Sequence, residues 1–210
     1  MTLAALRYMG QGAGVTVMLA AAVILLSSAL GMGLALARLY AWPPLRALAA
    51  GYALVTRGVP LLVLLIGSYF SLPYLGITLP VYPAAIVVMG FYFASYMGEV
   101  FRGAIMAVPA TQWDAGRSVG FRAFQTFRIV ILPQARRLCV APFLNTALSV
   151  VKNTSLISAI GGWELVTAGR EIGERTGDLM PVYLGVALGY YLICFPLARL
   201  ATFVERTSHA

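Results

Sequence analysis

Residues 109–133 read PATQWDAGRSVGFRAFQTFRIVILP, a polar segment with three arginines inside a chain that is otherwise mostly apolar. Pro109 breaks the preceding helix. Thr111 is a candidate N-cap for a new helix, and Asp114 three residues later is its candidate capping-box partner. Gly120 can end that helix, because glycine adopts a positive φ more easily than other residues do. We therefore expect a short helix over residues 112–119.

A second helical piece is expected over residues 121–131, and Pro133 is expected to start the next element. The short helix carries three small residues, Ala115, Gly116 and Ser118. A short helix of this kind, held between two membrane spans, suits docking into a groove of another protein.

The composition identifies the class of protein. The 210-residue chain is 60% hydrophobic and 10% charged, with a mean hydropathy of +0.86. Soluble domains carry about 25% charged residues, so too few charges remain to cover a soluble surface. We therefore expect an integral membrane protein. The net charge of +8 is compatible with nucleic-acid binding, but basic residues also gather in cytoplasmic loops of membrane proteins, and that explanation fits better.

The first span is expected to stay in the mature protein. Arg7 precedes an apolar stretch far longer than the roughly 7–15-residue core of a signal peptide. Cys139 and Cys194 lie in apolar runs without ligand-like spacing, so we expect unpaired structural cysteines rather than a disulfide or a metal site.

Five stretches are candidates for spanning helices, each of which needs about 20 apolar residues. The chain has no obvious repeat, linker or low-complexity tract, so residues 1–210 are expected to form one all-α domain. A short external helix is expected over residues 163–178, separated from the fourth span by Gly161 and Gly162. The five spans are residues 14–39, 48–72 (interrupted at Thr56-Arg57-Gly58), 81–100, 138–160 and 181–203.

The arginines indicate the orientation, because Lys and Arg are concentrated in cytoplasmic loops. In a five-span chain, most of the arginines fall on one side of the membrane. The opposite side holds Arg7, an uncharged loop and a segment in which Arg170 and Arg175 are balanced by four acids. This predicts an outside N-terminus, a cytoplasmic C-terminus and a cytoplasmic 109–133 loop. The residues that fall together on the arginine-rich side are Arg38, Arg46, Arg57, Arg102, Arg117, Arg122, Arg128, Arg136, Arg137, Arg199 and Arg206.

The sequence contains no recognisable site that could supply energy for transport, such as an ATP-binding site. A phosphate-binding loop needs glycines followed by Lys-Ser/Thr, and the one lysine, Lys152, has a different context. The one histidine, His209, lies in a tail that we expect to be disordered. A Ser/His or Cys/His catalytic pair and a metal cluster are therefore not expected, and energy for any uphill transport has to come from elsewhere.

Polar groups at membrane depth are costly and indicate function. Arg57 is either an anchor at the inner interface or part of a transport pathway. Glu99 and Arg102 are three residues apart and can pair on one helix face, so a structural ion pair at the interface is the alternative to a pathway role, with Tyr96 nearby.

The fourth span holds the most suggestive polar group. Asn145, Ser149 and Lys152 (or Asn153) share a helix face. A polar break inside a span is tolerated only where it is buried in protein or lines a watery cavity. Lys152 suits a carboxylate partner, and the alternative is a lysine that marks the outer interface. The pathway candidates of this span are Asn145, Ser149, Lys152, Asn153, Thr154 and Ser155.

These motifs resemble those of the permeases of ABC importers. The loop pattern of that family is Glu-Ala-Ala, three residues, Gly, nine residues, Ile, one residue and Leu-Pro. Here it reads Asp114-Ala115-Gly116, Gly120, Val130 and Leu132-Pro133, with every spacing kept. Asp, Gly and Val replace Glu, Ala and Ile, which leaves the strength of individual contacts open but not the identity of the loop.

Further motifs resemble the polar amino acid branch of the family, of the histidine, glutamine and arginine type. The similarity covers residues 12–206. The matching elements are Arg57-Gly58-Val59-Pro60-Leu61-Leu62, Tyr96 to Gly103 with Glu99 and Arg102, Gln125-Thr126-Phe127, and Lys152-Asn153-Thr154-Ser155-Leu156.

The resemblance implies a type I importer permease fold and a bacterial cytoplasmic (inner) membrane location. It implies two permease subunits (two copies of this chain, or this chain and a paralogue), two ATPases that hold ATP and magnesium, and an external or periplasmic binding protein that delivers a polar amino acid or a derivative. It gives structural roles to Arg57, Pro60 and Arg102. The residues that it implies for coupling to the ATPase are Thr111, Asp114, Ala115, Gly116, Gly120, Leu132 and Pro133.

Two other classes stay open. A secondary transporter or channel would work without ATP, but proton coupling usually needs titratable groups deep in the membrane, and only Glu99 comes near. A membrane enzyme is the third class, and the missing catalytic constellation argues against it.

Overall fold

The computed structural model describes residues 3–208, with side chains up to Glu205, so His209 lies outside the described residues. All regular elements in this range are helices. In chain order they are α1 (Leu3–Tyr40), α2 (Pro43–Gly58), α3 (Leu61–Ser71), the 3₁₀ turn η1 (Leu72–Leu75), α4 (Val81–Met106), α5 (Ala110–Ser118), α6 (Ala123–Thr126), the π-helix η2 (Phe127–Ile131), α7 (Leu132–Asn153), the 3₁₀ helix η3 (Thr154–Ile160), α8 (Leu165–Thr176) and α9 (Leu179–Ser208).

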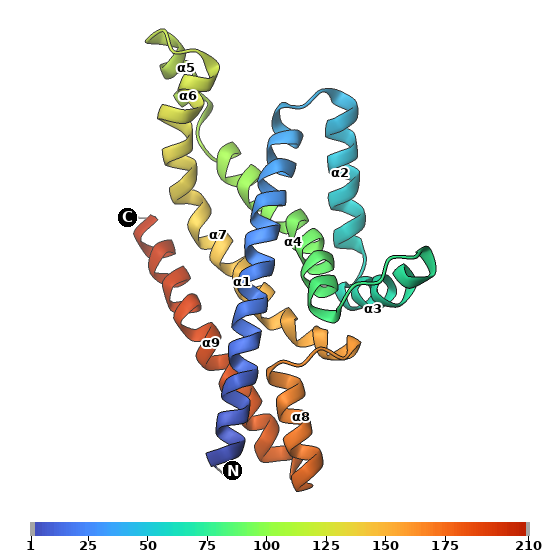
Figure 1. Ribbon diagram of the computed structural model, residues 1–210. Helices are drawn as coiled ribbons and strands as arrows, with labels where there is room; N and C mark the ends of the chain where they lie inside the picture. The colour runs from blue at the N-terminus through green and yellow to red at the C-terminus, as the bar shows by residue number, and fades with distance from the viewer. Residues whose placement is uncertain (1–2, 209–210) are drawn as a thin grey trace.

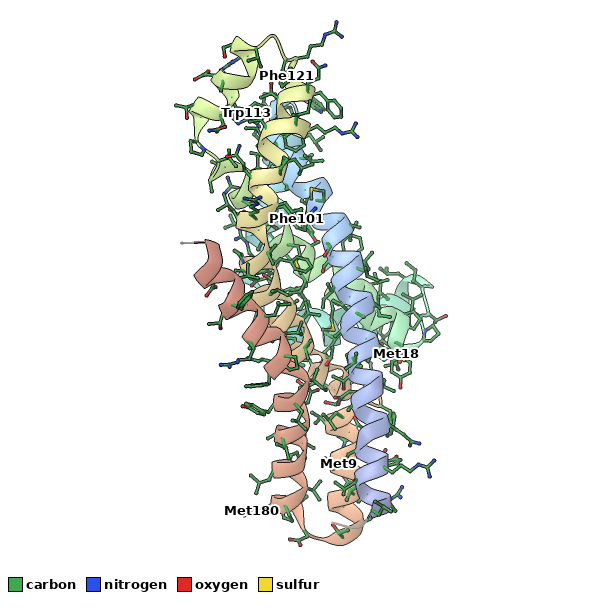
Figure 2. The ribbon with its side chains drawn as sticks, turned by 90° about the vertical axis from the view of Figure 1, so that its left-hand side faces the viewer. Met9, Met18, Phe101, Trp113, Phe121 and Met180 are labelled. Carbon is green, nitrogen blue, oxygen red and sulfur yellow. The ribbon has the colours of Figure 1, made fainter. Side chains whose placement is uncertain are left out.

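The molecule is elongated, and α1 runs along most of its length (Figure 1). α5 and α6 lie at one end, and α8 lies at the other end beside the N-terminus. In the side-chain view, Trp113 and Phe121 mark the α5 end, whereas Met9 and Met180 mark the α8 end (Figure 2). The polar loop of residues 109–133 is thus separated from the external helix by the length of the helix bundle.

Small residues let α1 and α4 approach closely, as is typical of helices packed in a membrane. A Cβ on Gly31 would lie 2.7 Å from Met97 Cβ and 2.8 Å from the backbone nitrogen of Gly98. The buried core around this pair continues through α3, α7 and η3, with Leu65, Met89 and Val150 fully buried. α1 and α4 therefore form the packed centre on which the other helices are arranged.

The second predicted span is broken, but not at the predicted residues. Thr56, Arg57 and Gly58 complete α2, and the break lies at Val59 and Pro60. Proline disfavours the helical region for the residue before it, and Val59 is accordingly extended, with φ −107° and ψ 134°. The two helices on either side are bent by 100°, which makes α3 project sideways from the bundle (Figure 1).

Three helices are long and apolar enough to cross a membrane: α1, α4 and Leu179–Glu205 of α9. The bent pair of α2 with α3 and η1 would make a fourth if it counts as one span. α7 is not in this set. It begins at Leu132 rather than near residue 138, and it carries Arg136, Arg137 and Lys152. The count of five spans therefore stays a prediction.

The predicted external helix is present as α8. It begins at Leu165 rather than Trp163, after Gly161 has turned the chain with a φ of 81°. α8 packs against α1 and α9. Close contact is again made by a glycine, since a Cβ on Gly169 would lie 2.3 Å from Val186 Cγ2.

Candidate functional site

The short helix of the polar loop exists, but its predicted cap is wrong. α5 has Pro109 at its N-cap and no side-chain cap hydrogen bond. The Pro109 carbonyl accepts from the Gln112 amide at 3.0 Å, so the first turn already starts at Pro109 and Thr111 lies inside it. Asp114 does not close a capping box; it pairs with Arg117 on the next turn.

Gly120 follows the end of α5, as predicted, and has a positive φ of 82°. The Phe121 amide donates to the Gly116 carbonyl at 3.1 Å and the Gly120 amide to the Arg117 carbonyl at 3.0 Å. These bonds satisfy the last carbonyls of α5 and reverse the chain. α6 then follows, so backbone hydrogen bonds fix the turn between α5 and α6.

Gly116 is the buried residue of α5, and it packs directly on α6. A Cβ on Gly116 would lie 2.4 Å from Thr126 Cγ2 and 2.7 Å from Thr126 Oγ1. Thr126 itself is 1% exposed. Of the predicted coupling residues on the helix, Thr111, Asp114 and Ala115 are exposed, whereas Gly116 faces inward. The outer face of α5 is thus free for a partner while its inner face is locked to α6.

The rest of the loop is continuous with α7. The predicted second helical piece is split into α6 and the π-helix η2, and η2 runs directly into α7. Leu132 and Pro133 lie in the first turn of α7. Pro133 was predicted to start the next element, and α7 begins one residue earlier, at Leu132. Ile131 is fully buried against Ile105 and Val108 of the preceding span.

Aromatic contacts tie the loop to the helices below it. Trp113 of α5 stacks on Phe127 with ring centroids 6.4 Å apart, and Tyr40 at the end of α1 meets the same ring edge-on at 6.2 Å. Through Phe127, α5 is thus connected to η2, which continues into α7, and to the end of α1.

A cluster of charges lies between the loop and the middle of the molecule. Glu99 pairs with Arg102, as the spacing predicted. Arg38 of α1 also binds Glu99, and Arg57 approaches it at 4.0 Å. Glu99 is the acid that these three arginines share, so the cluster carries a net positive charge. The cluster also joins the ends of α1, α2 and α4.

A polar chamber of about 390 Å³ lies between α4 and α7. It brings together four residues predicted to line a pathway. Asn153 Nδ2 donates to the Ser149 carbonyl at 2.8 Å, and Ser149 Oγ donates to the Asn145 carbonyl at 3.1 Å. Asn153, rather than Lys152, therefore shares this helix face. The lining residues are Tyr92, Phe93, Tyr96, Asn145, Thr146, Ser149 and Asn153.

The other predicted pathway residues lie elsewhere in this single chain. Thr154 is fully buried, and its hydroxyl donates to the Val151 carbonyl at 2.7 Å. Ser155 bonds the Lys152 carbonyl at 2.8 Å. Lys152 is exposed and lines neither this chamber nor its neighbour.

A second cavity of about 510 Å³ adjoins the polar chamber. Tyr96 and Thr146 line both cavities, and Arg57 and Glu99 line the second one. The two cavities thus follow one another from the polar face of α7 toward the charge cluster. The polar residues of α7 and the charge cluster thus border two neighbouring cavities that share Tyr96 and Thr146.

Some residues of these sites were missed by sequence reasoning. Tyr92, four residues before Tyr96, is bonded to it through the two hydroxyls at 3.2 Å, and its helical spacing was the available signal. Glu164 was counted only as one of the four acids of the segment that holds Arg170 and Arg175. It is fully buried and caps α8 by accepting from the Val166 amide at 2.9 Å and the Thr167 amide at 3.1 Å. Tyr190 of α9 also donates to it at 2.8 Å.

Comparison with known proteins identifies the family. Residues 27–209 match the model of the binding-protein-dependent transport system inner membrane component. The L-cystine transport system permease protein TcyB of Bacillus subtilis (strain 168) is 38% identical over 173 residues, which cover 82% of this chain and 74% of that protein. The probable amino-acid ABC transporter permease protein YckA of the same organism is 35% identical, over 95% of this chain and 88% of that one.

Solved structures give the same result. A crystal structure of an amino acid ABC transporter with histidines contains a chain that superposes with a TM-score of 0.89 at 26% identity, covering 96% of this chain and 94% of that one. An inward-facing MetNI methionine ABC transporter shares the fold, with a TM-score of 0.74 at 20% identity. The chain therefore belongs to the family of binding-protein-dependent transport system inner membrane components, the permease subunits of ABC importers.

Proposed function

We propose that this permease carries polar amino acids or related derivatives into the cell, driven by ATPase subunits that dock on α5. The proposal is supported by an exposed α5 that is attached to the rest of the chain, together with two adjoining cavities between α4 and α7 that hold polar side chains. The relatives named for cystine and amino-acid transport support the substrate class.

The proposed topology has five spans, with the N-terminus outside and the α5 end in the cytoplasm of a bacterial inner membrane. α1, α4 and α9 are three of the spans, the bent pair of α2 with α3 is the fourth, and α7 with η3 is the fifth. The arginine-rich α5 end supports this orientation. Two ATPases then bind ATP and magnesium, a second permease subunit completes the pathway, and an external binding protein delivers the substrate.

Coupling follows from how α5 is attached. The exposed Thr111, Asp114 and Ala115 would contact the ATPase, while Gly116 and Gly120 keep the helix in place. Closure of the two ATPases would then move α5 together with α1, α4 and α7, and rigid-body motion of this kind converts one membrane conformation into another.

The chamber chemistry favours an amino acid with an uncharged side chain. Its lining consists of amides, hydroxyls and aromatic rings, and the adjoining cavity leads to three arginines around one glutamate. No acid lines the chamber itself, and the Glu205 carboxylate is occupied by the Asn145 amide at 3.3 Å; a cationic side chain would meet net positive charge beyond the chamber. Asn145, Ser149 and Asn153 would bind polar groups of the substrate, and Tyr96 would separate the two cavities.

The test is purification of the intact complex from its native membrane, followed by identification of its ATPase, second permease subunit, binding protein and bound ligand. A bound neutral polar amino acid supports the proposal. A complex without any ATPase would refute it and favour the alternative, a secondary transporter. Asn153→Asp measures the charge preference, because a carboxylate in the chamber should improve competition by lysine or arginine at least tenfold, with Asn153→Gln as the neutral control.

A further inference from the structure

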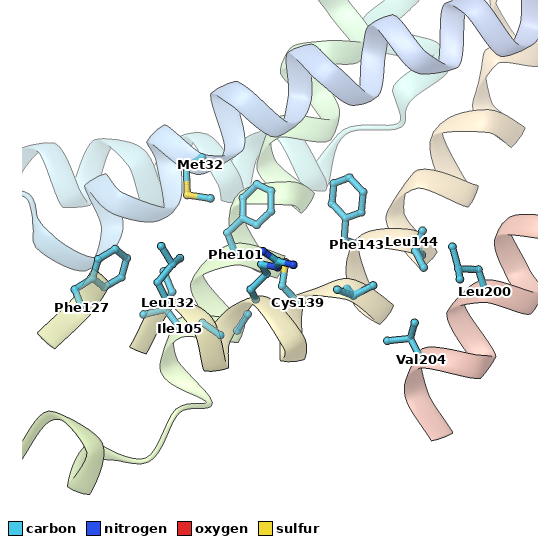
Figure 3. Close-up of a pocket in the computed structure, with 14 residues that line it drawn as sticks. Met32, Phe101, Ile105, Phe127, Leu132, Cys139, Phe143, Leu144, Leu200 and Val204 are labelled. Carbon is cyan, nitrogen blue, oxygen red and sulfur yellow. The ribbon is translucent and has the colours of Figure 1, made fainter. Parts of the chain in front are cut away.

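An apolar groove lies between α1, α4, α7 and α9, and only Ala104 of its lining also lines the second cavity. Its volume of about 560 Å³ is in the range of cavities that hold small ligands, about 300–1,000 Å³. Figure 3 shows side chains of all four helices facing this space: Met32 of α1, Phe101 of α4, Phe143 of α7 and Leu200 of α9. The accessible walls are apolar throughout, and Arg136 borders the groove with the aliphatic part of its side chain.

The groove lies toward the α5 end of the bundle. Phe127 of η2 and Leu132 of the first turn of α7 line it at one side. Leu132 is 40% exposed and Leu200 is 49% exposed, so the groove is bordered by apolar groups that remain accessible. In a membrane, the molecule that meets such a surface first is a lipid.

Arg136, which borders the groove, forms no ion pair among the described side chains. No Asp or Glu occurs between Asp114 and Glu164 in the sequence. Among the described side chains, ion pairs involve Arg38, Arg57, Arg102, Arg117 and Arg170 but not Arg136. Arg136 lines the groove itself. Its positive charge is therefore available to an anionic ligand.

We propose that this groove binds an anionic phospholipid of the cytoplasmic leaflet, with an acyl chain against the apolar walls and the phosphate at Arg136. Basic pockets between membrane helices on the cytoplasmic side are typical sites for such headgroups, and the inference rests on the orientation proposed above. A second copy of this chain is a poorer occupant. It brings the same net charge of +8 and does not neutralise Arg136.

Lipid retention tests the proposal without any transport assay. The full chain is reconstituted in vesicles of equal phosphatidylglycerol and phosphatidylcholine, extracted in mild detergent and examined by native mass spectrometry. The wild-type chain should retain phosphatidylglycerol at least fivefold over phosphatidylcholine. Arg136→Gln should lose that preference, whereas Arg46→Gln, an exposed arginine that does not line the groove, should keep it.

The two cysteines provide a second measurement with an internal control. Cys139 lines the groove, whereas Cys194 packs against the main core. Maleimide labelling of Cys139 should be at least threefold slower in vesicles that contain phosphatidylglycerol than in pure phosphatidylcholine, with Cys194 unchanged. This protection should disappear in Arg136→Gln.

Three results would overturn the proposal. Equal retention of the two lipids by the wild-type chain is the first. Equal loss of phosphatidylglycerol preference in Arg136→Gln and Arg46→Gln is the second, because the arginine in the groove would then have no special role. Protection of Cys139 that depends on protein density rather than on lipid would identify a second copy as the occupant. Each readout is independent of amino-acid uptake, so failure here is distinct from failure of the proposed transport function.

Discussion

Gly116→Ala should destabilise the α5 end of the molecule, although alanine is the better helix former. A methyl group at this position would lie 2.4 Å from Thr126 Cγ2 and 2.7 Å from Thr126 Oγ1. Thr126 is buried, and its β-branched side chain has few rotamers available in a helix. Overpacking of this kind costs about 1–3 kcal/mol, whereas replacing glycine by alanine in a helix gains about 1 kcal/mol. The expected net loss is up to about 2 kcal/mol.

In a Thr126→Ala background, Gly116→Ala should no longer destabilise the α5 end. Thr126→Ala removes both close atoms and leaves Thr126 Cβ, at 3.0 Å from the added methyl. Thr126 Oγ1 is buried without a hydrogen-bond partner among the described residues, so its removal breaks no bond. In this background Gly116→Ala should be neutral or stabilising by up to about 1 kcal/mol. The double-mutant cycle should give a coupling energy of about 1–3 kcal/mol.

Hydrogen exchange of the α5 amides measures this local stability. A loss of up to about 2 kcal/mol corresponds to exchange up to about 30-fold faster in Gly116→Ala, with amides of α8 at the opposite end as the control. ATP-coupled uptake by the same variants shows whether the loop has to be rigid. Equal effects of Gly116→Ala in the two backgrounds, with coupling below about 0.5 kcal/mol, would refute the packing argument.

Three further predictions concern the loop, the chamber and the external helix. Asp114→Arg or Gly120→Pro should abolish uptake while ATP hydrolysis continues, because the docked helix is repelled or distorted; unchanged uptake per ATP hydrolysed would contradict the assignment of α5. Asn153→Leu should lower the uptake rate at least tenfold with complex assembly intact, as measured in proteoliposomes, and normal kinetics would remove Asn153 from the pathway. Glu164→Ala should destabilise the chain by about 2–4 kcal/mol, since it removes a helix cap and leaves buried donors without an acceptor. Glu164→Gln should retain part of the stability. An unchanged thermal unfolding midpoint in Glu164→Ala would contradict this prediction.

Local patterns in the sequence were enough to predict several features. The helical class followed from apolar runs, the end of α5 from the glycine at position 120, and the Glu99–Arg102 pair from helical spacing. Each of these depends on residues within a few positions of one another. Local geometry fixes such features before the rest of the chain is placed.

Features that depend on tertiary packing were missed or misplaced. Arg38 is 61 residues from Glu99 in the chain, and only the packing of α1 on α4 brings them together. The burial of Glu164 depends on α1 and α9, which supply Thr16 at 3.5 Å and Tyr190 at 2.8 Å. The cap predicted at Thr111 is absent for a local reason, since Pro109 already starts the helix and Thr111 lies inside its first turn.

The need for glycine at position 116 was also hidden in the sequence. Gly116 was noted as a departure from alanine in the family pattern, but its cause is the buried Thr126 ten residues later, across a turn. The contact between Gly116 and Thr126 forms only when α5 is folded onto α6, so the sequence alone does not reveal it.

The central claim is that ATP hydrolysis by separate subunits drives transport through this permease. The most direct test measures uptake into proteoliposomes that contain the complete complex and its binding protein, with either internal ATP or an imposed ion gradient. The account predicts that uptake requires ATP, rises in proportion to ATP hydrolysis and does not respond to the gradient. Uptake that follows the ion gradient and persists without ATP would contradict it.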